Sequence, residues 1–143
     1  GGRAVARMAR PRSRSVVTDC RPIAVVVVDH GSRRVASNAL LEEVARLYAE
    51  RSGRAIVEPA HMELAGPSLA EAVDRCVARG AELVVVHPYF LLPGRHADED
   101  IPRLAAEAAA RHPGLEVRVT APLGLHPLLA EVIEARVAEV IDF

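Results

Sequence analysis

An unbroken apolar run from Ile23 to Val28 constrains the fold of this chain more than any other feature. A strand is apolar at every position when helices cover both faces of its sheet. The run ends at the polar cluster Asp29-His-Gly-Ser-Arg-Arg34. In open α/β sheets the functional groups lie beyond the carboxyl ends of parallel strands, so we expect chemistry at this cluster.

The rest of the chain repeats this alternation of short β-branched runs and longer segments with helical spacing. Further strands are predicted at about residues 55–60, 82–86 and 115–120, and helices at about 38–50, 68–79, 98–111 and 127–141. Ser37 or Asn38 is expected to cap the first helix, and Pro67-Ser68 to open the second. The pattern predicts a three-layer αβα sandwich, with a four-stranded parallel sheet and helices on both faces.

Bulk properties narrow the classes of function. A chain of 143 residues has room for one domain, and its net charge of −1 does not favour nucleic acid as a partner. No apolar stretch approaches the roughly 20 residues that cross a bilayer. The two cysteines, Cys20 and Cys76, lie far apart and have no C-x-x-C partner, so they predict neither a disulfide framework nor a zinc site.

The amino-terminal residues differ in composition from the rest. The first 18 residues carry no acidic side chain and contain five arginines, namely Arg3, Arg7, Arg10, Arg12 and Arg14. Such a segment is typical of an organelle transit peptide, and equally of a disordered extension or a cloning remnant. We therefore divide the chain into an extension at 1–20 and a domain at 21–143.

Three side chains stand out because each follows a different predicted strand. His30 follows the first strand, Glu63 the second and His96 the third. Imidazole and carboxylate together suit a borderline divalent cation, and neutral imidazole also accepts protons near physiological pH. A lone histidine at a strand end is more often a hydrogen-bonded loop residue. The order of these residues along the chain does not decide between a metal site, an acid/base site and chance.

Several motifs, in matching order, resemble the small-type sirohydrochlorin chelatase family over about residues 23–141. They are D-H-G-S-R-R at 29–34, I-V-E-P-A-H-M-E-L-A at 56–65, P-Y-F-L-L-P-G-R-H at 88–96 with D-I-P at 100–102, and T-A-P-L-G at 120–124. The H-G-S-R and P-G-R-H…D-I-P signals are specific as a pair. The first two blocks resemble most closely the plastid-type sirohydrochlorin ferrochelatases.

The resemblance implies a chelatase-like fold and a lyase that inserts Fe²⁺ or Co²⁺ into sirohydrochlorin, in siroheme or cobalamin synthesis. It implies a homodimer that works without ATP, in the chloroplast stroma or in a bacterial cytoplasm. The catalytic and metal-holding residues fall on His30, His96 and Glu63. Metal insertion releases two pyrrole protons, for which a neutral imidazole is a suitable base.

The substrate that the resemblance implies is rich in carboxylates, which favours arginine as a binding residue. We expect Arg33, Arg34 and Arg95, beside the two histidines, to bind these groups together with Ser32. A surface charge or a local salt bridge is the alternative for each arginine. We expect no permanently bound cofactor, because the metal is a substrate. We also expect no iron–sulfur cluster, because two cysteines cannot supply one.

Other polar residues have simpler interpretations. His61 is expected to support the site or ligate directly, whereas His112 is expected on the surface and His126 at a helix cap. Asp100 is suited to the helix dipole or to attracting metal. Gly31 and Gly94 are expected to allow tight turns. Residues 89–92 are expected to pack the loop, with the wall of a flat apolar pocket as the alternative.

Two other functions compete with metal insertion. A non-catalytic carrier of metal or tetrapyrrole would use the same exchangeable ligands. A histidine-dependent phosphate-transferring enzyme also places His-Gly after a first strand, but it requires arginine immediately before the histidine, where this chain has Asp29.

Overall fold

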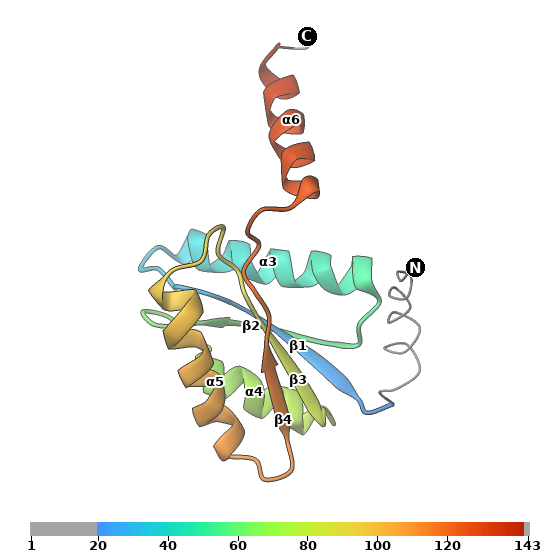
Figure 1. Cartoon of the computed structure of the whole chain (residues 1–143), viewed down its shortest axis with the longest axis vertical. Coiled ribbons are helices and arrows are strands. Elements are labelled where there is room, and N and C mark those ends of the chain that lie inside the picture. The colour runs from blue at the N-terminus through green and yellow to red at the C-terminus, as the bar shows by residue number, and fades with distance from the viewer. Residues whose placement is uncertain (1–19, 142–143) are drawn as a thin grey trace, which may run out of the picture.

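The structure is a computed structural model, and it describes residues 20–141 (Figure 1). Apart from Cys20, the predicted extension lies outside the described residues. The elements in chain order are β1 (Ile23–Asp29), α3 (Val35–Ser52), β2 (Ile56–His61), α4 (Leu69–Ala78), β3 (Leu83–Pro88), the π-turn η1 (His96–Asp100), α5 (Ile101–Ala110), β4 (Glu116–Val119) and α6 (Pro127–Ile141).

The four strands form one parallel sheet in the order β2-β1-β3-β4, as the sequence predicts. Alternate residues of β1 face opposite layers because successive strand side chains point to opposite faces. Ala24, Val26 and Val28 pack into the larger core, beneath α4 and α5. Val25 and Val27 pack on the other face, against α3. Helices therefore lie on both faces, and β1 is central.

Local sequence explains where α4 begins, but it does not explain where α3 begins. Helix α4 begins with a complete capping box, in which Ser68 and Glu71 each bond the other's backbone N–H. Helix α3 begins at Val35, and neither Ser37 nor Asn38 caps it, so that prediction was wrong. The Asn38 amide instead accepts from Ser32 N and donates to Ser32 O, at 3.1 and 2.7 Å, and so holds the polar loop after β1.

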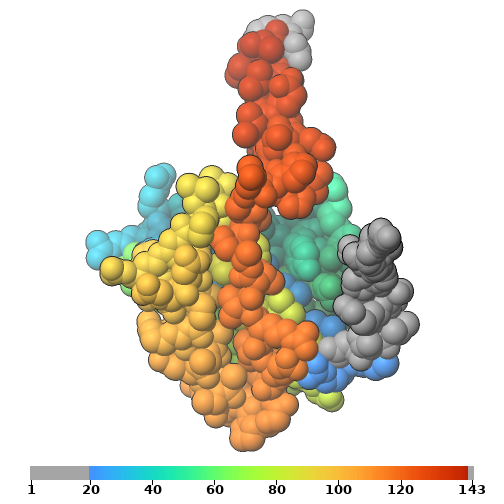
Figure 2. All heavy atoms as spheres, viewed as in Figure 1, coloured from blue at the N-terminus to red at the C-terminus, as the bar shows by residue number. Residues whose placement is uncertain are grey.

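Helix α6 stands away from the rest of the domain (Figures 1 and 2). The segment before it is fixed to the loop after β3, because Leu123 N donates to Phe90 O and Gly124 N to Leu91 O. The large apolar residues of α6 are exposed, namely Leu128, Val132, Ile133, Val137, Val140 and Ile141. Within the described residues, none of the helices combines the length and apolar character needed to cross a bilayer.

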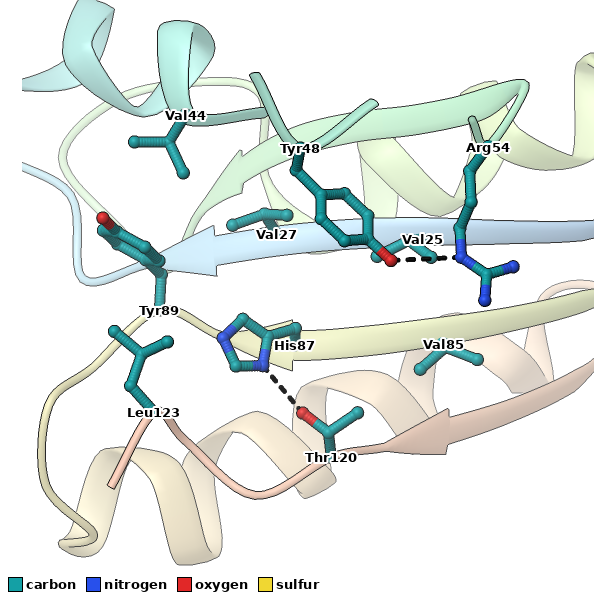
Figure 3. Close-up of a pocket in the computed structure, with 10 residues that line it drawn as sticks. All are labelled: Val25, Val27, Val44, Tyr48, Arg54, Val85, His87, Tyr89, Thr120 and Leu123. Atoms are coloured by element: carbon teal, nitrogen blue, oxygen red, sulfur yellow. Dashed lines mark hydrogen bonds between the residues drawn. The ribbon is translucent and has the colours of Figure 1, made fainter. Parts of the chain in front are cut away.

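An open groove lies on the sheet face that α3 only partly covers (Figure 3). Its volume is about 380 Å³, and its wall is mainly apolar, with Val25, Val27, Val44, Val85 and Leu123 among the lining residues. Arg54 Nε donates to the Tyr48 hydroxyl at one end, and His87 bonds Thr120 nearby. The groove is therefore an apolar surface that α3 borders but does not cover.

Candidate active site

The pairing of β1 with β2 continues beyond both strands and brings His30 beside Glu63. Met62 N donates to Asp29 O at 2.9 Å, and Glu63 N donates to His30 O at 3.1 Å. These bonds extend the parallel register, in which Asp29 already pairs with His61. Two residues 33 positions apart in the sequence thus share one edge of the sheet.

Gly31 permits this close approach of the two chain segments. Its φ is +95°, and a Cβ there would lie 1.9 Å from the carbonyl oxygen of Glu63. No side chain fits, and the left-handed conformation disfavours other residues as well. The expected tight turn is confirmed at Gly31. Gly94 also lies in a bend, but it has no positive φ and a Cβ there would have no neighbouring atom within 4 Å, so this bend does not require glycine.

The three candidate residues meet at the carboxyl edge of the sheet. His30 Nε2 lies 2.8 Å from Glu63 Oε2, and the ring centroids of His30 and His96 lie 4.6 Å apart at 76°, edge to face. All three side chains are between 40% and 57% exposed, so a ligand can reach them. Within residues 20–141, no three His, Cys, Asp or Glu side chains already stand in a metal-holding arrangement.

His96 has a carboxylate partner of its own. It begins η1, and its Nδ1 lies 2.8 Å from Asp100 Oδ2 at the other end of that turn. The π-turn was not predicted, because the loop's proline and glycine content suggested no helix before Asp98. Neither was this bond, although an i,i+4 spacing of histidine and aspartate was visible in the sequence.

A third histidine–carboxylate pair, Asp29 with His61, lies one step earlier on the same two chain segments as His30 and Glu63. His61 is only 1% exposed, and its Nδ1 lies 2.6 Å from Asp29 Oδ1. The buried ring therefore has its bonding partner inside the protein, and its Cβ lies next to the turn at Gly31. Of the two roles expected for His61, the structure favours support of the site over ligation.

The predicted substrate-binding residues surround the histidines in sequence and are accessible. Arg33, Arg34 and Arg95 are exposed, and within the described residues none of their guanidinium groups has a hydrogen-bond partner. The Ser32 hydroxyl accepts from Arg34 N at 3.0 Å, which shapes the loop that carries both arginines. The three guanidinium groups are thus available to an anionic ligand.

The remaining histidines and Cys76 have local explanations. His112 bonds Asp74 at 2.6 Å and is less exposed than predicted, whereas His126 caps α6 by accepting from Leu128 N. Burial lowers the pKa of His87, which lies in the groove. Burial also raises the pKa of Cys76 to about 12, so this thiol is not a nucleophile near neutral pH.

The loop between β3 and η1 is partly packed against the core and partly exposed. Phe90 packs against the larger core, as expected, whereas Leu91 and Leu92 are mostly exposed. Packing was therefore predicted correctly for part of this loop only.

Comparison with known proteins decides the family. A sequence model of the CbiX family matches residues 24–140. This chain belongs to the CbiX family. It is 52% identical over 113 residues to the chloroplastic sirohydrochlorin ferrochelatase of Arabidopsis thaliana, an alignment that covers 79% of this chain and 50% of the plant protein. The chain thus spans about half the length of that relative.

Two solved structures share the fold of this chain. A cobalamin (vitamin B12) biosynthesis CbiX protein from Marinobacter aquaeolei matches with a TM-score of 0.68 at 33% identity, covering 82% of this chain and 96% of that one. The sirohydrochlorin chelatase SirB from Bacillus subtilis subspecies spizizenii, in complex with cobalt, matches with a TM-score of 0.73 at 27% identity, covering 82% of this chain and 50% of that one. The predicted fold class is confirmed.

Proposed function

We propose that this chain is a sirohydrochlorin chelatase, which inserts Fe²⁺, or in a close variant Co²⁺, into sirohydrochlorin. The observation that carries the proposal is the meeting of His30, Glu63 and His96 at one accessible edge of the sheet. Similarity to a plant ferrochelatase and to a cobaltochelatase of Priestia megaterium supports it.

Metal insertion needs a proton acceptor because two pyrrole N–H protons leave as the cation enters the ring. A neutral imidazole accepts protons near physiological pH, so His30 or His96 is suited to act as the base. Glu63 lies within hydrogen-bond distance of His30, so it receives or relays a proton and offsets the cation's charge. The same three groups hold the incoming metal.

Delivery requires ligands that release the metal again. A closed cage of four ligands would retain the ion, whereas a few partly exposed groups exchange it. His30, Glu63 and His96 match this requirement, because each is open to solvent and two of them are bonded to each other. Arg33, Arg34 and Arg95 bind the carboxylates of the macrocycle and hold its centre against the histidines.

Absorbance spectra test the activity directly. Purified protein under anaerobic conditions, with sirohydrochlorin and Fe²⁺ or Co²⁺, is expected to shift the macrocycle's spectrum far faster than the metal alone. His30→Ala and His96→Ala are expected to remove most of this acceleration, and His112→Gln, remote in sequence from the site, to retain it. Full activity in both alanine variants would exclude these roles. Stoichiometric binding without turnover would select the carrier function instead.

We further propose a second copy of this chain as a partner, with α6 of one copy in the groove of the other. Helix α6 carries an exposed apolar stripe, and the groove beside α3 is an apolar surface of the same chain. Apolar surfaces of this kind are stabilised when they are removed from water together.

The fixed segment before α6 favours the partner's groove over the chain's own. Hydrogen bonds from Leu123 and Gly124 hold this segment to the loop after β3, so only Leu125 and His126 separate it from α6. Two residues leave α6 little freedom to reverse its direction. The helix therefore points away from its own sheet, as Figure 1 shows.

Sedimentation velocity tests the dimer. The wild-type chain is expected to sediment as a dimer, and Ile133→Glu with Val137→Glu as a monomer, because charges on the apolar stripe cannot be buried unpaired. Glu134→Gln, on the same helix, is the matched control and is expected to remain dimeric. A monomeric wild-type chain at micromolar concentration would overturn the proposal.

We also propose the chloroplast stroma as the location. The arginine-rich, acid-poor composition of residues 1–18 supports it, as does similarity to a chloroplastic relative. Fractionation of the source cells, followed with an antibody against residues 21–141, is expected to find the protein in the chloroplast stroma. Recovery of the protein outside chloroplasts would contradict this location, and recovery from a bacterial cytoplasm would favour the alternative.

A further inference from the structure

The two site histidines are held by opposite ring nitrogens. Glu63 lies against Nε2 of His30, whereas Asp100 lies against Nδ1 of His96, both at 2.8 Å. An ionised carboxylate only accepts hydrogen bonds, so the nitrogen facing it carries the proton. In a neutral imidazole the other nitrogen then holds the lone pair. That nitrogen is Nδ1 in His30 and Nε2 in His96.

The π-turn explains why Asp100 reaches His96. Ile101 N donates to His96 O, which closes the wide turn that places residues 96 and 100 on one side. Asp100 is only 25% exposed, and its other contact is a long one, 3.8 Å from Arg103. Its Oδ2 is therefore committed to His96 rather than to a strong ion pair.

We propose that Asp100 is a positioning residue that holds His96 with the proton on Nδ1, and so presents the Nε2 lone pair to the incoming metal ion. The inference rests on the proposed function for the identity of that metal. Carboxylates that fix the tautomer and orientation of a ligating histidine are a general feature of metal sites. Here the carboxylate is four residues away on the same turn.

This arrangement makes the two histidines unequal before substrate arrives. Nε2 of His96 has no hydrogen-bond partner among the described residues, whereas Nε2 of His30 is covered by Glu63. His96 therefore offers its lone pair on Nε2. His30 offers its lone pair on Nδ1, and would present Nε2 only after Glu63 moves aside.

Nitrogen-15 NMR of the metal-free protein tests the tautomer without any variant. Long-range ¹H–¹⁵N spectra at pH 8, assigned by comparison with His96→Gln, are expected to show His96 protonated on Nδ1. An Nε2-protonated His96 would overturn the proposal. This result does not depend on turnover of sirohydrochlorin, so it separates failure of this inference from failure of the proposed function.

Calorimetric titration with Co²⁺ alone provides the second readout. Asp100→Asn is expected to mix the tautomers and to weaken Co²⁺ binding roughly tenfold, the lower end of the range for lost supporting carboxylates. Asp100→Glu is expected to restore part of the affinity. Asp98→Asn, an exposed aspartate of the same turn, is the matched control and is expected to bind as wild type does. Equal affinities and equal tautomers in the two asparagine variants would also overturn the inference.

Discussion

Two histidine–carboxylate pairs lie side by side at the edge of the sheet, and they differ mainly in exposure. Asp29 with His61 and His30 with Glu63 have similar bonds, at 2.6 and 2.8 Å. The His61 ring is 1% exposed, whereas that of His30 is 40% exposed. The same pairing thus suits a structural role where water is excluded and the proposed catalytic role where water enters. Replacing one member of each pair distinguishes these roles.

His30→Ala is expected to have the largest effect, and on activity alone. Loss of a positioned acid/base group lowers rates by about 10²–10⁴-fold, so kcat/KM is expected to fall by about 10³. Unfolding free energy, measured with urea, is expected to change by less than about 0.5 kcal/mol because the ring is exposed. A loss of stability comparable to that of His61→Ala would break the distinction.

Gly31→Ala is expected to damage both pairs. The added Cβ would meet the Glu63 carbonyl, and the backbone conformation disfavours alanine. We expect a loss of at least about 2 kcal/mol in unfolding free energy together with reduced activity. Gly94→Ala is the matched control, because nothing lies near its Cβ position. Wild-type behaviour of Gly31→Ala would show that the two chain segments separate freely here.

His61→Ala is expected to affect stability first. It leaves a cavity and removes the partner of Asp29, a combination that lowers unfolding free energy by about 2–4 kcal/mol. Activity per folded molecule, measured below the unfolding transition, is expected to fall much less than in His30→Ala. If His61→Ala unfolds at the same urea concentration as wild type, the buried pair is not a structural element.

The three exposed arginines beside the histidines test substrate binding rather than the chemical step. Arg33→Gln, Arg34→Gln and Arg95→Gln are each expected to raise the KM for sirohydrochlorin by on the order of fivefold, the equivalent of about 1 kcal/mol, with kcat nearly unchanged. Arg136→Gln on α6 is the control. The increases are expected to shrink at high salt because the groups are exposed. Unchanged KM in all three variants would remove these residues from the substrate site.

His87 is a partly buried histidine whose ring bonds Thr120 rather than a carboxylate. It therefore tests what burial alone does to the pKa of an imidazole. Burial lowers its pKa in the folded state, so the unfolded chain binds the proton more readily. The stability this provides is complete above the unfolded pKa, near 6.5, and is lost as pH falls toward the folded value. Urea unfolding at pH 7.5 and 5.5 is expected to show a smaller decrease for His87→Gln than for wild type. An identical decrease in unfolding free energy for the two proteins would contradict a lowered pKa of His87 in the folded state.

The fold was predictable because the spacing of apolar residues and the polar residues at the strand ends indicate the same strands along the chain. The run before Asp29 identified the central strand, and Pro67-Ser68 identified the start of α4, where Ser68 forms a capping box with Glu71. The start of α3 was not predictable from its caps, because Asn38 binds the loop instead. The extension of β3 through His87 and Pro88 was also missed, since proline usually ends a strand.

The proximity of the candidate site residues was predictable from the sequence, but the bonds between them were not. Strand order places His30, Glu63 and His96 at one edge, which follows from parallel topology alone. The burial of His61 and the pairing of His96 with Asp100 depend on side-chain directions within a π-turn and a glycine turn. Sequence spacing does not determine those directions. The exposed face of α6 was likewise visible as a stripe, yet nothing in the stripe said where the helix points.

The two hydrogen bonds from Leu123 and Gly124 join the root of α6 to the loop that leads into His96. The segment that precedes α6 and the loop that leads into His96 are therefore joined through their backbones at Phe90 and Leu91. If α6 docks on a second copy as proposed, that contact forms on a segment bonded to the chain only a few residues before His96.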